Sequence, residues 1–266
     1  MPITLQVHDD GVAEVTIDVP PVNALPVAGW FELAEAVTAA GQQADSAVIL
    51  RAEGKGFCAG VDIKELAADE GHLALVGVNR GCYAAFKAVY ECEVPVIAAV
   101  QGFCLGGGIG LVGNADIIVA SDDATFGLPE VDRGALGAAT HLSRLVPQHR
   151  MRAMVYLAEY ATADELARYG SVRAVVARDQ LHDTALEVAG QLAAKSPTIL
   201  RRAKEALNGI DPIDVNRSYR FEQGLTYELT LRGVADEARA AFVEKRDADF
   251  DAPATGGADR PASPDA

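Results

Sequence analysis

The sequence predicts an α/β domain with largely buried strands, followed by a mostly helical C-terminal part. Short apolar stretches such as SAVILRA, VIAAVQ and DIIVAS alternate with helical patterns through the first half of the chain. Continuous apolar strands of this kind are typical of a sheet that is covered on both faces. After about residue 135 the helical patterns dominate. Half of the 266 residues are apolar, so the chain can form a sizeable core.

The individual elements follow from the same patterns. ITLQVHDDGVAEVTID alternates apolar and polar residues around Asp10-Gly11, which is typical of a β-hairpin. A helix is expected over VAGWFELAEAVTAA, and a second one, from about Gly71 to Tyr90, leads into the strand VIAAVQ. Past residue 135 we expect one short strand at VRAVV and helices over residues 178–195, 197–208, 216–232 and 235–246.

These elements divide the chain into three expected parts. The α/β core is expected over residues 1–195 and the helical region over 196–250. The last stretch, DAPATGGADRPASPDA, is small, polar and rich in proline and glycine, so residues 251–266 are expected to form a disordered tail.

Charge and composition exclude several classes of function. The formal net charge of −15 argues against general nucleic-acid binding and against binding to anionic membrane surfaces. No apolar run approaches the roughly 18 residues that a membrane span requires. The opening MPITLQVHDDG lacks a basic region and an apolar region of the secretory kind, so we expect a cytoplasmic protein. The four cysteines form no C-x-x-C pair and no zinc pattern with the five histidines, which predicts buried reduced thiols and no metal site.

Two glycine-rich loops suggest a binding site for a negative oxygen. GFCLGGGIGL, residues 102–111, precedes an apparent helix, and GKGFCAGVDIKEL, residues 54–66, follows a strand. Glycines let another molecule approach the backbone and leave N–H groups available at a helix start. Two such groups from different loops would form an oxyanion hole, in which one donor contributes roughly 3–4 kcal/mol. The alternatives are a tight strand-to-helix turn for the second loop and an N-cap role for Asp62 in the first.

With a third motif, ATFGLPEVDRGALGAATHLSRLVP, these loops resemble the crotonase (enoyl-CoA hydratase/isomerase) superfamily over almost the whole chain. The resemblance implies a crotonase-like spiral of ββα repeats with a helical C-terminal trimerisation region, and a homotrimer or a hexamer built as a dimer of trimers. It also implies an acyl-CoA substrate, with no cofactor beyond the coenzyme A of that substrate. The thioester oxygen should lie between the backbone N–H groups of Val61 and Gly107, and Glu130 should be catalytic. The residues expected near the coenzyme A portion are Ala24, Ala59, Asp62, Ile63, Lys64 and Lys245.

The sequence departs from the family pattern at one position. Hydratases of the family carry a glutamate three residues after the second oxyanion glycine, where this chain has Gly110. Two carboxylates suit the addition of water to a double bond, so hydration by that route is not expected here. The missing side chain is expected to leave room for a bulkier acyl group. Asp132 and His141 are candidate substitutes. The alternatives are a solvated or helix-capping acid for Asp132 and a helix-surface or capping histidine for His141.

Within the superfamily, the central motifs resemble the actinobacterial hydrolases that open a ring of a CoA-linked bicyclic fragment during steroid (cholesterol) degradation. That resemblance implies a retro-Claisen hydrolysis of a bicyclic β-diketone, in which water adds to a ketone and the departing carbanion is stabilised as an enolate. One general base, Glu130 or Asp132 with His141, would activate the water. The alternatives are an enoyl-CoA hydratase or isomerase of fatty-acid-type β-oxidation and a non-catalytic acyl-CoA binder. The retained Glu130 argues against the binder.

Overall fold

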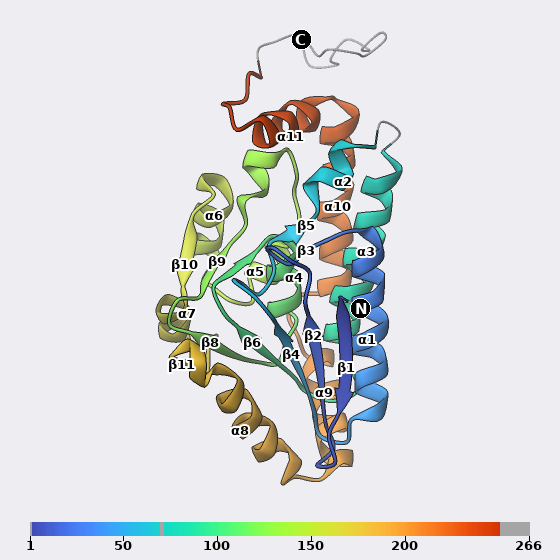
Figure 1. Ribbon diagram of the computed structural model, residues 1–266, viewed down its shortest axis with the longest axis vertical. Coiled ribbons are helices and arrows are strands. Elements are labelled where there is room, and N and C mark those ends of the chain that lie inside the picture. The colour runs from blue at the N-terminus through green and yellow to red at the C-terminus, as the bar shows by residue number, and fades with distance from the viewer. Residues whose placement is uncertain (1, 70–71, 251–266) are drawn as a thin grey trace.

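The core of the molecule is a six-stranded sheet in the order β1-β2-β4-β6-β8-β11 (Figure 1). The structure is a computed structural model that describes residues 2–69 and 72–250. The first two strands form the expected antiparallel hairpin, and the other neighbours in the sheet pair in parallel. The strands are β1 (Ile3–Val7), β2 (Val12–Ile17), β4 (Ala47–Ala52), β6 (Val96–Val100), β8 (Ile117–Ser121) and β11 (Ala174–Val176).

Helices cover both faces of this sheet, which confirms the expectation drawn from its continuous apolar strands. Because side chains alternate across a strand, Val48 and Leu50 face one helical layer, while Ile49 faces the opposite one. Figure 1 shows α1 (Val27–Gln43) and α3 (Leu73–Tyr90) packed side by side against one face. The helix α8 (Leu181–Ala193) covers the other face.

Two small sheets contain strands that the apolar and polar patterns of the sequence did not predict. One has the order β10-β9-β7 and the other pairs β3 with β5. Their strands have two or three residues each, which is too short to show a period of two in the sequence. The expectation of one strand after residue 135 was therefore wrong, because β10 also lies there. The bounds are β3 (Ala24–Leu25), β5 (Gly60–Val61), β7 (Phe103–Leu105), β9 (Thr125–Gly127) and β10 (Tyr160–Thr162).

The helical C-terminal region is confirmed. The expected helices correspond to η2 (Arg178–Gln180) with α8, and to α9 (Pro197–Gly209), α10 (Val215–Leu231) and α11 (Val234–Glu244). The expected boundary at residue 195 falls between α8 and α9, and the division into separate parts stays a prediction. Residues 251–266, the expected tail, lie outside the described residues. The remaining helices are α2 (Ile63–Ala67), α4 (Gly107–Val112), η1 (Pro129–Arg133), α5 (Ala139–Leu142), α6 (Gln148–Leu157) and α7 (Ala163–Tyr169).

The fold bears on the predictions about the cysteines and about membrane spans. All four cysteines are buried free thiols, and burial raises the pKa of Cys58 to about 12. Among residues 2–69 and 72–250, no helix is long and apolar enough to cross a membrane.

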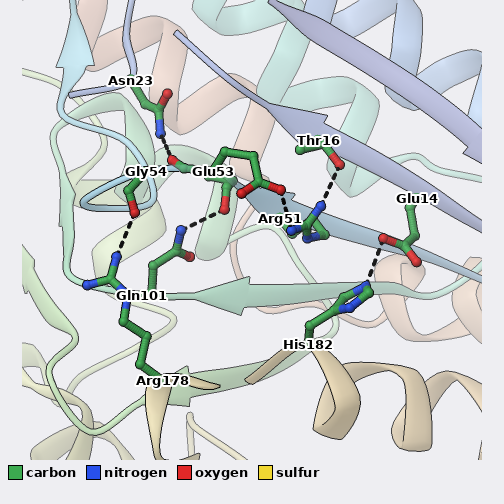
Figure 2. A network of polar contacts seen from close by, with 10 residues as sticks. Glu14, Thr16, Asn23, Arg51, Glu53, Gly54, Gln101, Arg178 and His182 are labelled. Carbon is green, nitrogen blue, oxygen red and sulfur yellow. Dashed lines mark hydrogen bonds and ion pairs between the residues drawn. The ribbon is translucent and has the colours of Figure 1, made fainter. Parts of the chain in front are cut away.

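A network of polar contacts anchors the first glycine loop where it leaves β4 (Figure 2). The buried Asn23 side chain donates to the carbonyl oxygens of Glu53, at 2.8 Å, and Gly56, at 2.9 Å. Gln101 donates to the carbonyl oxygen of Ala52 at 2.6 Å, and Arg178 donates to that of Gly54 at 2.6 Å. Residues 52–56 are thereby tied to three other segments, which fixes the path of the chain into β5.

Candidate active site

The two glycine loops meet at the end of the sheet. The carbonyl oxygen of Cys58 in the first loop accepts a hydrogen bond from the N–H of Leu105 in the second, at 2.8 Å. Gly60 has a φ of +94°, a conformation that side chains disfavour. A Cβ added there would lie 3.2 Å from the backbone nitrogen of Gly107. The close approach of the two loops therefore depends on glycine at position 60.

The two backbone N–H groups predicted to bind a thioester oxygen lie on these neighbouring loops. Asp62 N donates to Leu25 O at 3.0 Å. Because successive N–H groups of a strand point to opposite sides, the N–H of Val61 points away from β3. Gly107 is the first residue of α4, so its N–H is one of those without an acceptor inside the helix. Their joint role as an oxyanion hole stays a prediction.

Glu130 reaches the second glycine loop from the short helix η1. Gly106 has a φ of +55°, and a Cβ added there would lie 2.6 Å from Glu130 Oε1. The other carboxyl oxygen, Oε2, is buried without a hydrogen-bond partner in the described part of the chain. Burial raises the pKa of Glu130 to about 8, which outweighs the lowering effect of Arg133. At neutral pH the Glu130 carboxyl group is therefore protonated, and it lies beside the second glycine loop.

The space expected at Gly110 is already filled. A Cβ added to Gly110 would lie 2.1 Å from the Cζ atom of Phe86, which comes from α3. The Phe86 ring in turn packs against the rings of Trp30, His141 and Tyr219, with centroid separations of 5.7, 5.0 and 5.0 Å. The expectation that the missing side chain leaves room for a bulkier acyl group was wrong, because an aromatic ring fills that volume.

The two candidate substitutes for the missing acid lie in different environments. Asp132 is exposed, as its solvated alternative predicted. His141 is 1% exposed, so the alternative of a helix-surface residue was wrong. Burial lowers the pKa of His141 to about 3, with a further contribution from Arg144, so the imidazole is neutral. Catalytic roles for Asp132 and His141 stay predictions.

A small cavity lies beyond Glu130. Its volume is about 160 Å³, and most of its wall is apolar. Two carboxylates from distant parts of the sequence line it, Glu130 of η1 and Glu222 of α10. The other lining residues are Leu128, Val131, Leu136, Gly137, Ala139, Val155 and Leu225. The cavity therefore places two acids beside a surface that suits an apolar group.

Glu222 is the site residue that sequence reasoning missed. Its Oε1 accepts from the N–H of Thr140 at 2.8 Å and from the Thr140 hydroxyl, and its Oε2 accepts from the N–H of Ala139 at 2.9 Å. Burial raises the pKa of Glu222, and these three donors oppose that rise. The available signal was a polar stripe at helical spacing in α10, whose buried members include Tyr219, Gln223, Thr226 and Thr230.

The residues expected near coenzyme A fall on two neighbouring elements. β3 pairs with β5, so that Ala24 lies opposite Gly60. Asp62 caps α2 by accepting from Lys64 N at 3.0 Å, as its alternative predicted, and Lys64 is exposed. These contacts place Ala24 beside the continuous segment that carries Ala59, Asp62, Ile63 and Lys64.

Lys245 comes to the same side of the molecule from the C-terminal helix. It is exposed and directly follows α11, which packs beside α2 (Figure 1). The next residue, Arg246, pairs with Glu237 and Glu244. Binding of coenzyme A by these residues stays a prediction. Among the residues that the structure describes, no group of three histidine, cysteine or acidic side chains could hold a metal ion.

Comparison with known proteins identifies close relatives. Residues 8–253 match the family described as Enoyl-CoA hydratase/isomerase. Two relatives carry the name (7aS)-7a-methyl-1,5-dioxo-2,3,5,6,7,7a-hexahydro-1H-indene-carboxyl-CoA hydrolase. The one from Rhodococcus jostii is 64% identical over 92% of this chain and 95% of its own length. The one from Mycobacterium tuberculosis is 65% identical over 92% of this chain and all of its own length.

A solved structure supports the fold independently. The crystal structure of an enoyl-CoA hydratase/isomerase from Xanthobacter autotrophicus is 29% identical to this chain. It superposes with a TM-score of 0.82 and covers 92% of each chain. The α/β core and the C-terminal helices described above are therefore those of the crotonase fold.

Proposed function

The chain belongs to the enoyl-CoA hydratase/isomerase family, and we propose on that premise that it opens a carbon–carbon bond by hydrolysis. The proposed substrate is the CoA ester of a bicyclic compound from steroid degradation. The observation that carries the proposal is the likeness, over nearly the whole chain, to two hydrolases of such an ester. The position of Glu130 against the second glycine loop supports it.

The chemistry of the named substrate suits hydrolytic ring opening. The name places ketones at ring carbons 1 and 5 and leaves one ring double bond, between carbons 3a and 4. The two ketones are thus joined through carbon 7a and that double bond, as a vinylogous β-diketone. Cleavage between carbons 1 and 7a would release an electron pair that the double bond and the second ketone delocalise. The substrate thereby supplies the stabilised leaving carbanion that a retro-Claisen reaction needs.

The reaction can be written with the residues of this site. The oxygen of water bonds to carbon 1, the bond to carbon 7a breaks, and carbon 1 becomes a carboxylic acid. The electron pair passes into the conjugated system, which finally takes a proton. The N–H groups of Val61 and Gly107 hold the thioester oxygen and stabilise negative charge that reaches it. Glu130 is the carboxyl group that exchanges a proton with the reacting atoms.

Binding and assembly belong to the same proposal. Ala24, Ala59, Asp62, Ile63, Lys64 and Lys245 would bind the coenzyme A portion, with no further cofactor. A homotrimer or hexamer is supported by exposed apolar side chains on the C-terminal helices, among them Ile199, Leu207, Phe221 and Leu231. The cytoplasmic location stays a prediction from the sequence.

Product analysis tests the proposed reaction. The enzyme is incubated with the bicyclic CoA ester and, in parallel, with a short trans-2-enoyl-CoA. Ring opening and hydration each add one water, so NMR must show whether a ring-opened carboxylate or a β-hydroxy thioester forms. A thiol reagent detects coenzyme A released by simple thioester hydrolysis. We expect ring opening without thiol release.

A substitution assigns the reaction to this site. Glu130→Gln is expected to slow ring opening by about 10²–10⁴-fold. Fast hydration of the enoyl ester with the bicyclic ester untouched would overturn the proposal in favour of a hydratase. Unchanged turnover in Glu130→Gln would overturn the assignment of catalysis to Glu130.

A further inference from the structure

We propose that Glu222 is the second catalytic carboxylate of this site and accepts a proton from the hydrolytic water. This rests on the proposed function, in which one water must be deprotonated and one carbanion protonated. Glu222 would take the place of the glutamate that hydratases carry at position 110. It enters from α10 and not from α4, where Phe86 leaves no room for a side chain.

The cavity gives the two carboxylates a shared space for a reactant. Glu130 and Glu222 line the same volume of about 160 Å³, and the remaining wall is almost entirely apolar. A water occupies about 30 Å³ of liquid, so this space can hold a water and part of a ring. Glu130 Oε2 is buried with no protein partner among the described residues. A buried polar atom without a partner is uncommon in folded proteins, and a catalytic role or a polar ligand such as water explains it.

The hydrogen-bond donors around the two groups assign their roles. Glu222 accepts three hydrogen bonds, from the N–H groups of Ala139 and Thr140 and from the Thr140 hydroxyl. Donors stabilise the ionised form and oppose the rise that burial causes in the pKa of Glu222, so Glu222 is the more readily ionised of the two carboxyl groups. Within the described residues its Oε2 accepts one hydrogen bond, from the N–H of Ala139, which leaves a lone pair for water. Glu130, whose Oε2 lacks a donor, is the group that keeps a proton.

The charges around the cavity agree with this division. Within the described chain, the charged groups that act on Glu130 are Arg133 of η1 and Glu222 of α10, and Glu222 raises the pKa of Glu130. Cys82 of α3 and Tyr219 of α10 also lie close enough to interact with Glu130. Burial raises the pKa values of both well above their ordinary values, so both are neutral. The donors and charges thus favour ionisation of Glu222 and protonation of Glu130, which gives the site one base and one acid.

The proposed step is balanced. Glu222 takes one proton from water while the water oxygen bonds to the ketone carbon. The carbon–carbon bond then breaks, and its electron pair stays on the leaving carbon. Glu130 gives its proton to that carbanion. Proton exchange through a new water returns the proton from Glu222 to Glu130, so one water is consumed and the enzyme is restored.

The competing interpretation is that Glu222 is only a structural cap. It satisfies the first N–H groups of α5 and so holds α10 against that helix. Loss of a cap alone would lower stability without changing which protonation states are active. Kinetics as a function of pH therefore separate the two roles.

The test measures kcat/KM for ring opening against pH in the full chain. The wild type is expected to show a bell-shaped profile, with a rising limb from ionisation of Glu222 and a falling limb near pH 8 from ionisation of Glu130. Glu222→Gln is expected to lower kcat/KM by at least about 100-fold and to remove the rising limb. The matched control is Glu228→Gln on the exposed face of the same helix, which should behave as the wild type.

A second variant tests the role if Glu222→Gln fails to fold. Thr140→Val removes one donor to Glu222 and leaves both backbone donors. The pKa of Glu222 should rise, so the rising limb should move to higher pH. A Thr140→Val variant that melts at a lower temperature but keeps the rising limb of its pH profile unmoved would overturn the catalytic role. Near-wild-type turnover in folded Glu222→Gln would overturn it as well. If the wild type itself opens no ring, the proposed function fails as well, which is a distinct result.

Discussion

The two glycine loops and the cavity beyond Glu130 are connected through Glu130, and they are built differently. The loops bring backbone atoms close together. A Cβ added to Gly60 would lie only 3.2 Å from the backbone nitrogen of Gly107. The cavity brings side chains together from η1 and α10. Backbone geometry depends on which residues lie next to each other in sequence, whereas the cavity depends on how distant elements pack. The loops could therefore be predicted from short motifs, and the cavity could not.

Among changes to the glycine loops, the largest expected effect comes from removing one backbone donor. Gly107→Pro deletes the N–H of position 107, which should slow ring opening by about 10²–10³-fold. Any side chain at this position also approaches Trp30, since an added Cβ would lie 2.5 Å from its Cη2 atom. Gly107→Ala is therefore the control, because it adds the Cβ and keeps the N–H. Equal rates in the two variants would show that the donor has no catalytic role.

The anchoring of the first loop gives the next largest effect. Asn23→Ala removes the side chain that bonds to Val19 N, Glu53 O and Gly56 O. Asn23 also has a φ of 53°, which alanine tolerates less well. We expect a loss of about 2–3 kcal/mol in the free energy of unfolding, because buried backbone groups lose their partners. Chemical denaturation measures it. A loss below about 0.5 kcal/mol would mean that water replaces the amide.

On the cavity side, the tight packing at Gly110 can be tested directly. Gly110→Ala would place a methyl group 2.1 Å from Phe86, whose ring is held by Trp30, His141 and Tyr219. Overpacking should lower the free energy of unfolding by about 1–3 kcal/mol. Thermal denaturation measures the change. If the variant is as stable as the wild type and binds a larger acyl group, the space at position 110 is available after all.

The same contrast explains what the sequence could predict. The hairpin at Asp10-Gly11, the buried strands and the C-terminal helices follow from local patterns, and Glu130 followed from its motif. The filling of Gly110 did not, because Phe86 lies 24 positions earlier and meets it only through the packing of α3 on α4. Glu222 was missed for the same reason. The polar stripe at helical spacing in α10 was a weak signal, because it does not distinguish a buried carboxylate from a solvated one.

The last prediction concerns the pH dependence of stability that Glu130 causes. Its pKa in the folded state is about 8, against an ordinary value of 4.5, because burial disfavours the charged form. Between these two pH values the folded state binds more protons at this site than the unfolded state. The contribution of Glu130 to the free energy of unfolding must therefore fall as pH rises through this range.

Glu130→Gln removes that dependence, because its amide stays neutral over the range. Urea denaturation at several pH values should show the wild type losing more stability than the variant between pH 4.5 and about 8. The matched control is Glu228→Gln, whose side chain is exposed and whose slope should equal that of the wild type. Equal slopes in wild type and Glu130→Gln would mean that Glu130 ionises in the folded state as readily as in the unfolded chain. The cavity side of the site would then be open to water, and the division of protons between Glu130 and Glu222 would lose its basis.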